Sequence, residues 1–373
     1  MMIKIVKIFF TTIILFLVLD FSLGNFLLAE LETKNIYITT EQITEQNIKN
    51  EKKFRIKNKD FSHTLRKNFK GTSIFGNKEN IICTDQHGFK KNCIKKKDSN
   101  NYDFFFIGDS FTEGIGLNYS ETFVGIFEDK KKYNIANLGV SSYSPIIYYH
   151  KLNFFLDNGL KTKHVILYLD VSDVEDEVYR YECNKSVCYK EPKNKTVNNK
   201  LDIINNIKNS TKKNLKITFT LIRHTKNLFC TNRLISFCYD IYDRNLLRYS
   251  WINDFKKNTD TNGIFQKPFE QEVFYLNKIS NLLKNKNIKF SLAIYPWPGN
   301  ILYNHNFNDY QNYWKNFCID KCDSFINHFE DFEMLKKIKS TKQIIKQNYF
   351  HGDAHFNKRG NLLIAEKLIK IID

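Results

Sequence analysis

The sequence lacks several patterns that mark common functional classes. It contains no Cys-x-x-Cys pair, no zinc-finger or helix-turn-helix pattern, and no internal repeat. These absences argue against a zinc site and against the common modules that bind nucleic acids. Proline and glycine are also scarce, with 5 and 14 residues in a chain of 373. Beside the abundant Lys, Asn, Ile and Phe, this scarcity indicates the coding bias of an AT-rich genome.

Apolar and basic residues are abundant instead. Hydrophobic residues make up 42% of the chain, including 33 Phe and 20 Tyr. That content is ample for a packed core in one large or two modest domains. The formal net charge is +17. We attribute it to lysines spread over a solvated surface, and the alternative is attraction to acidic glycans or anionic lipid headgroups.

The N-terminal segment predicts export. Lys4 and Lys7 precede a long apolar stretch that Asp20 interrupts near its outer end. Basic residues before a hydrophobic segment are typical of an export signal whose basic end stays in the cytoplasm. The segment is long enough to span a bilayer of about 30 Å. We therefore predict that residues 1–29 anchor the chain in the inner membrane, with the remainder in the periplasm. The alternative is a cleaved signal peptide and a secreted protein.

The cysteines agree with export. Eight are present, and they fall into four close pairs: Cys83 with Cys93, Cys183 with Cys188, Cys230 with Cys238, and Cys318 with Cys322. An even number in local pairs behind an export signal favours disulfides in an oxidising compartment. Zinc is the rival interpretation, but no histidine lies at ligand spacing beside these pairs. We predict disulfides that staple loops, and no metal site.

The hydrophobic pattern predicts an α/β fold. Apolar runs predict strands, amphipathic spacing predicts helices, and the two kinds alternate, which implies a parallel sheet covered on both faces. The expected strands are residues 103–107, 133–136, 164–169 and 288–295, and the expected helices are residues 119–132, 146–158, 272–286 and 361–372. Before them come a linker, residues 30–51, and an N-terminal extension, residues 52–102, expected to pack on the main domain, residues 103–373. Residues 174–269 show no strong strand signal, and we interpret them as a mostly helical insertion that could cover the site.

The most informative stretch is Gly108-Asp109-Ser110-Phe111-Thr112-Glu113-Gly114, which directly follows the apolar run ending at Ile107. Ser110 is thereby expected at the carboxyl end of a buried strand, where open α/β sheets bind their ligands. It is also expected at a helix start, whose amides can hold an oxyanion. A serine at this place could instead be a simple helix cap. Asp353 and His355, just before the last helix, supply an acid and a base for a serine triad.

These motifs resemble those of the SGNH (GDSL-type) hydrolase family. The Ser110 motif resembles the family's first block. Its second block is resembled by Asn137-Leu138-Gly139-Val140-Ser141-Ser142-Tyr143-Ser144-Pro145, and its last by Asp353-Ala354-His355. The resemblance implies a flavodoxin-like three-layer α/β/α fold with a parallel sheet. It also implies Ser110 as nucleophile, His355 as base and Asp353 as its partner. The amides of Ser110 and Gly139 are the implied oxyanion donors, and Gly139 as a plain turn glycine is the alternative.

The sequence departs from this family pattern at two places. The third block usually supplies an asparagine as an oxyanion donor, and here Ser172 stands at that position in Asp170-Val171-Ser172-Asp173. Ser172 is therefore a candidate donor with a shorter reach. The spacing of two residues between Asp353 and His355 is the second departure, because three is commoner. We expect both side chains to lie on one loop.

Three other features have weaker signals. Asp109 is expected to fix the turn through backbone hydrogen bonds. The loop of Tyr295 to Pro298 could wall a substrate pocket or pack on the core. The acidic residues between Asp173 and Glu177 lack the spacing of a calcium loop, and we interpret them as part of a solvated loop near the site.

The expected function is acyl transfer through a serine ester. The resemblance implies esterase, lipase or carbohydrate O-acyl activity, and export favours acyl groups, acetyl first, on envelope or extracellular glycans. Two alternatives stay open: a glycan O-acyltransferase served by a membrane partner that delivers the acyl group, and a non-catalytic glycan-binding or assembly protein with the same fold. No cofactor is expected.

Overall fold

The computed structural model describes residues 2–33, 49–75, 78–94, 99–179, 181–184, 187–190, 210–211, 214–219, 221–222, 225, 246–302, 307–351 and 353–372. The chain divides into two units, residues 1–46 with 194–240 and residues 47–193 with 241–373. The second unit contains the sheet and the motifs around Ser110, Gly139, Ser172 and His355.

The first unit is dominated by the long apolar helix α1, Met2–Thr33. Within it, Val6–Gly24 has a mean hydropathy of 2.1 and is long and apolar enough to cross a membrane. An export signal has the same character, so the helix agrees with either form of the predicted N-terminal segment. The Asp20 carboxylate accepts hydrogen bonds from the amides of Ile217 and Thr218, at 2.9 and 2.6 Å.

The second unit is built on an eight-stranded sheet with the order β12-β11-β8-β6-β7-β5-β4-β3. The first five of these strands are parallel: β12 (Ser324–Asn327), β11 (Lys289–Ile294), β8 (Lys161–Leu169), β6 (Asn101–Ile107) and β7 (Ile135–Asn137). The apolar runs of β6, β8 and β11 are buried, as expected for parallel strands covered on both faces. The predicted α/β class is confirmed.

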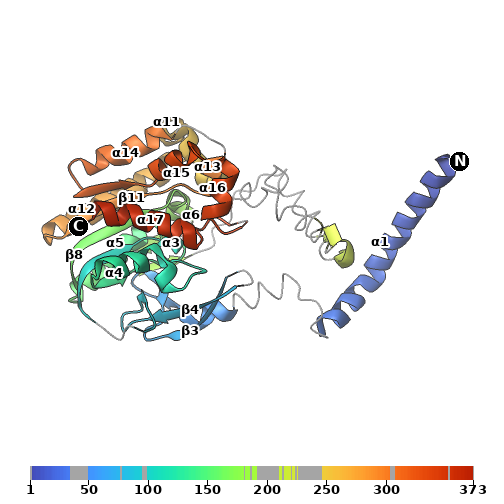
Figure 1. Ribbon diagram of the computed structural model, residues 1–373, viewed down its shortest axis with the longest axis horizontal. Coiled ribbons are helices and arrows are strands. Elements are labelled where there is room, and N and C mark those ends of the chain that lie inside the picture. Colours follow the sequence, from blue (N-terminus) through green and yellow to red (C-terminus); the bar gives the residue numbers. More distant parts are fainter. Residues whose placement is uncertain are drawn as a thin grey trace. The chain divides into compact units, whose positions relative to one another are not determined.

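The crossover helices determine where the site lies. Two pairs of helices pack against each other. Helix α4 (Phe123–Lys131) contacts α17 (Lys358–Ile371), and α5 (Pro145–Asp157) contacts α12 (Gln266–Asn285). β6 leads through α4 to β7 on one side, and β7 leads through α5 to β8 on the other side of β6. Right-handed crossovers in opposite directions put α4 and α5 on opposite faces of the sheet, which the helices flank in Figure 1. The carboxyl end of β6 is therefore a topological switch point.

The N-terminal extension corrects the prediction of a wholly parallel sheet. Its strands β3 (Lys70–Phe75), β4 (Lys78–Thr84) and β5 (Lys90–Lys91) continue the sheet beyond β7 in antiparallel order. Their short, mixed runs gave no parallel-strand signal. A separate hairpin is formed by β1 (Arg55–Asn58) and β2 (Ser62–Leu65). The predicted Cys83–Cys93 and Cys318–Cys322 disulfides are both present.

The predicted insertion, residues 174–269, contains a hairpin that the sequence did not indicate. A two-stranded hairpin, β9 (Tyr181–Asn184) with β10 (Val187–Lys190), follows helix α6 (Asp173–Tyr179), so the described part is not purely helical. Cys183 and Cys188 face each other in its backbone register. Cys230 and Cys238 lie outside the described residues, as does most of the segment up to residue 245.

The remaining described elements are short helices and turns. They are α3 (Ser110–Glu113), η1 (Tyr119–Glu121), α10 (Leu246–Ser250), η3 (Trp251–Asp254), α11 (Phe255–Thr259), α13 (Pro298–Leu302), α14 (Asn308–Cys318), α15 (Phe329–Lys336) and α16 (Thr341–Asn348). Of these, α3 is the element that carries Ser110.

Candidate active site

Ser110 lies at the carboxyl end of β6, as the sequence predicts. It is the first residue of α3, which Asp109 caps by accepting a hydrogen bond from the Phe111 amide at 2.9 Å. The cap explains why the chain turns here from strand to helix. Gly108 permits the turn, because a Cβ there would lie 2.2 Å from Thr112 Oγ1 and 2.9 Å from the Tyr168 carbonyl oxygen. The Ser110 hydroxyl also contacts Asp109 Oδ2 at 3.0 Å.

The structure brings Ser110 together with the other two predicted triad residues. His355 Nε2 lies 2.7 Å from Ser110 Oγ, and His355 Nδ1 lies 2.5 Å from Asp353 Oδ1. The His355 amide donates to the same Asp353 oxygen at 2.9 Å, so the spacing of two residues lets one loop hold both side chains. Asn357 caps the following helix α17 and ends that loop. The three side chains form one continuous hydrogen-bonded chain.

Two aromatic rings flank the imidazole of His355. The Phe111 ring lies 4.7 Å from it on one side, and the Phe75 ring meets it edge-on at 5.8 Å. Phe75 ends strand β3, so the N-terminal extension reaches the site. Sequence reasoning missed Phe75, because only the antiparallel pairing of β3 to β4 brings it there.

The electrostatic interactions among the three triad side chains favour an ionised Asp353. Burial opposes the charge of Asp353, but the neighbouring His355 and its hydrogen bonds hold the pKa of the carboxyl below its ordinary value. Burial also favours the neutral form of His355, and here the Asp353 carboxylate raises the pKa of the imidazole above its ordinary 6.5. The two side chains remain accessible, with exposed fractions of 19% for His355 and 36% for Asp353. A solute can therefore reach the base.

The Gly139 amide is engaged elsewhere. Its N–H donates to Asn137 Oδ1 at 3.0 Å, so in this structure it is not directed at an oxyanion. Glycine is required here for another reason, because a Cβ would lie 2.7 Å from the Glu113 nitrogen and the Thr112 Cβ. This geometry favours a structural role for Gly139, as in the turn-glycine alternative, and the reason is its close packing against α3.

Ser172 is buried and bound to Arg248. Its hydroxyl accepts a hydrogen bond from Arg248 Nη2 at 3.0 Å, and its amide donates to Asp170 Oδ1 at 2.6 Å. The guanidinium also pairs with Glu175 and Asp176. The Ser172 hydroxyl hydrogen remains a possible donor, and Arg248 is a cation beside it that the sequence did not indicate.

The acidic residues after β8 are not a solvated loop, contrary to the prediction. They form helix α6, and Asp173, Asp176 and Glu177 are buried. Their partners explain the burial: Arg248 pairs with Asp176, and the Ile146 amide donates to Glu177.

Asp109, Asp170 and Asp173 offer carboxylate oxygens within 4.8 Å of one another, which is the one such group among the described residues. Protein donors already serve all three, including the Tyr148 hydroxyl on Asp173. Burial and the nearby Asp170 raise the pKa of Asp109 to about 7, and burial raises the pKa of Asp173 well above its ordinary range. The raised pKa values favour the neutral forms of Asp109 and Asp173, which lowers the repulsion within this group of carboxyls.

Tyr295 and Trp297 are core residues in this structure. Both are buried, the Tyr295 hydroxyl donates to Asp109 Oδ1 at 3.2 Å, and Trp297 Nε1 donates to Asp170 Oδ2 at 2.7 Å. Of the two interpretations of this loop, packing on the core fits the geometry.

The fold and the site define an α/β protein with a Ser–His–Asp hydrogen-bonded chain at its switch point. No family model and no curated protein matches the chain. Among solved structures, it is similar to a lipolytic protein of the G-D-S-L family from Desulfitobacterium hafniense DCB-2, at 12% identity and a TM-score of 0.38 over 74% of this chain and 100% of the other. It is also similar to a member of the lipolytic G-D-S-L family from Veillonella parvula DSM 2008, at 11% identity and a TM-score of 0.39 over 72% of this chain and 97% of the other. Both carry the name of the family that the motifs resemble.

Proposed function

We propose that this protein is an exported serine esterase that removes acyl groups, acetyl first, from envelope or extracellular glycans. The observation that carries the proposal is the unbroken chain from Ser110 Oγ through the His355 ring to Asp353, with contacts of 2.7 and 2.5 Å. A serine hydroxyl is activated when a base lies within hydrogen-bond distance of it and an acid orients that base.

The proposed reaction has two steps. Ser110 Oγ bonds to the ester carbonyl carbon while its proton moves to His355 Nε2; the bond to the sugar oxygen then breaks, and His355 returns the proton to that oxygen. Water next attacks the acyl-serine, again giving a proton to His355, and the acid leaves as Ser110 regains its hydrogen. Asp353 holds Nδ1 throughout. The Ser110 amide and the Ser172 hydroxyl are the proposed oxyanion donors.

The substrate class is argued from location. The apolar helix α1 and the two disulfides among the described residues support export to an oxidising compartment. We propose that α1 anchors the protein in the inner membrane with the Ser110 domain in the periplasm, where acylated glycans are among the accessible esters. If a sugar hydroxyl replaces water in the second step, the same triad is an O-acyltransferase, and a membrane partner would supply the acyl group.

The test combines a covalent probe with two ester classes. The full chain in detergent is treated with a fluorophosphonate, and the adduct is located by peptide mass spectrometry. Acetate release from acetylated xylan is then compared with acid release from tributyrin, before and after labelling. We expect the adduct on Ser110 and the loss of acetate release with it.

Two results would contradict the proposal at different levels. If Ser110 stays unlabelled and acetate release is unchanged, the proposal that Ser110 is the nucleophile is wrong. If tributyrin is cleaved rapidly and acetylated xylan is not cleaved, the esterase mechanism stands and the glycan substrate is wrong. Transfer of labelled acetyl to an added oligosaccharide, without free acetate, would favour the transferase.

The pH dependence of hydrolysis is a further prediction. The base must be neutral to accept a proton, and Asp353 raises the pKa of His355 above 6.5. We therefore expect kcat/KM for p-nitrophenyl acetate to rise with pH through a single acidic limb centred above pH 6.5. A stopped-flow or spectrophotometric profile from pH 5 to 9 measures it. A limb below pH 6 would contradict a raised pKa for His355 as the titrating base.

A further inference from the structure

A loop beside Ser110 is held from several sides. Residues 139–143, here called the β7 loop, follow strand β7 and pack against α3 so closely that Gly139 leaves no room for a Cβ. Ser142 within it has a φ of 65°, in the left-handed region that a serine seldom adopts. Such a conformation persists only where the surroundings determine it. The contacts that hold the β7 loop therefore decide how the chain lies next to the nucleophile.

The first contact is a buried ion pair between the N-terminal extension and α3. Arg55 Nη1 and Nη2 lie 2.8 and 2.9 Å from the two carboxylate oxygens of Glu113, a bidentate geometry. The side chains are exposed by only 15% and 3%. Burial opposes the charge of Glu113, but Arg55, with Lys90 and the Ser141 amide, more than offsets it, so the pKa of Glu113 lies below its ordinary value. Glu113 is thus held as a carboxylate three residues after Ser110.

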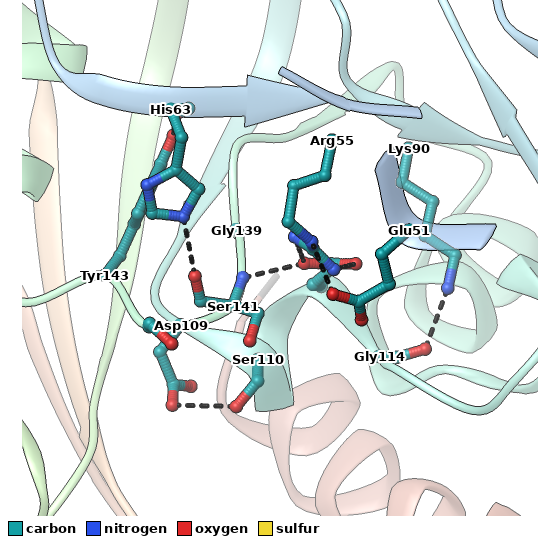
Figure 2. Close-up of polar contacts among 12 residues, drawn as sticks. Glu51, Arg55, His63, Lys90, Asp109, Ser110, Gly114, Gly139, Ser141 and Tyr143 are labelled. Atoms are coloured by element: carbon teal, nitrogen blue, oxygen red, sulfur yellow. Dashed lines mark hydrogen bonds and ion pairs between the residues drawn. The ribbon is translucent and has the colours of Figure 1, made fainter. Parts of the chain in front are cut away.

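The same carboxylate reaches the β7 loop. Glu113 Oε2 accepts a hydrogen bond from the Ser141 amide at 2.7 Å. Figure 2 shows the neighbouring contact between His63 and the Ser141 carbonyl oxygen. The Ser141 carbonyl oxygen lies 2.8 Å from His63 Nε2, and the Tyr143 hydroxyl donates to the His63 carbonyl. The hairpin of β1 and β2 thus binds the loop directly through His63 and indirectly through Arg55.

A buried lysine supports the loop from the interior. Lys151 donates to the Leu138 carbonyl at 2.8 Å and lies 4.8 Å from the centre of the Tyr143 ring. Burial lowers the pKa of Lys151 to about 7. These contacts hold Leu138, just before the β7 loop, and Tyr143 at its end, while Glu113 binds its middle.

We propose that Arg55 and Glu113 are positioning residues that hold the β7 loop in register with Ser110 for acyl transfer. The N-terminal extension is then part of the active site and not an accessory segment. The expected effect on rate rests on the proposed function. The expected effect on the position of the β7 loop does not. Neither residue touches the reacting atoms; both act through the Ser141 amide.

The test uses Glu113→Gln and Arg55→Lys in the full chain, with Lys57→Met as the control, because Lys57 is an exposed cation of the same strand. Glutamine keeps the shape of Glu113 without its charge, and lysine keeps the charge of Arg55 without the bidentate contact. We expect kcat for p-nitrophenyl acetate to fall about 10- to 100-fold in both variants with KM nearly unchanged. The Lys57→Met variant should match the parent. The combined variant should lose no more than the worse single one, since the two residues act as a pair.

A readout independent of activity separates this inference from the proposed function. Hydrogen exchange followed by mass spectrometry should show faster exchange of the peptide that contains Ser141 in Glu113→Gln than in the parent, with exchange in β8 unchanged. If Ser110→Ala abolishes hydrolysis but both pair variants keep full kcat and unchanged exchange, the positioning role is wrong and the esterase stands. If Ser110→Ala has no effect, the exchange result alone decides whether the pair holds the loop. Should Glu113→Gln fail to fold, Arg55→Lys gives the same comparison.

Discussion

Replacing Ser110 with alanine is expected to lower kcat for p-nitrophenyl ester hydrolysis by about four to six orders of magnitude. Serine hydrolases lose activity on this scale when the triad serine is removed, because the base is left without a nucleophile to activate. Here His355 Nε2 contacts Ser110 Oγ at 2.7 Å, so the removal breaks the chain at its reactive end. Rates on the acetate-to-octanoate series measure the loss, and the chain-length preference of the parent reports the size of the acyl site.

The matched control for this variant is Ser120→Ala. Ser120 is an exposed serine in the turn that follows α3, so its removal changes the same functional group without touching His355. Both variants should melt within a few degrees of the parent, because each loses a single hydroxyl. Equal rates for the parent and Ser110→Ala would assign any esterase activity to another group and would favour the non-catalytic alternative.

The sequence predicted the parts of the site that depend on local order. Ser110 follows a buried strand, and Asp353 and His355 precede the last helix; parallel topology then brings both to the same edge of the sheet. The Asp109 cap was likewise readable, because an acidic residue before a helix start accepts the first free amides. These signals need no knowledge of distant contacts.

The features that the sequence did not predict depend on non-local pairing. Phe75 and Arg55 belong to short polar strands whose pattern does not reveal that they join the site. The acidic helix α6 looked solvated because its carboxylates outnumber its apolar residues, and its partner Arg248 lies more than 70 residues later in the chain. The Gly139 amide is not free because it donates to the Asn137 side chain. The orientation of that side chain follows in turn from its hydrogen bond to the Thr112 carbonyl.

Asp353→Asn is expected to have the second-largest effect. The amide keeps an acceptor oxygen but loses the charge that stabilises the imidazolium and fixes its tautomer, a change that costs about 10⁴-fold in kcat for a fully buried triad acid. Because the Asp353 side chain is 36% exposed, water screens part of its charge, and we expect a smaller loss, about 10²- to 10³-fold. Steady-state rates at pH 8 measure it.

The same variant should also move the pH profile in a defined direction. Asp353 raises the pKa of His355, so its neutralisation lowers that pKa and shifts the acidic limb of kcat/KM to lower pH while the plateau falls. The control is Asp331→Asn, which removes the carboxylate from another described His–Asp contact, His328 to Asp331 at 3.0 Å, which includes no triad residue. That control should leave the limb in place. A plateau that falls without any shift of the limb would mean that Asp353 orients the ring but does not set its charge, and that the titrating group is one of the buried carboxyls around Asp109.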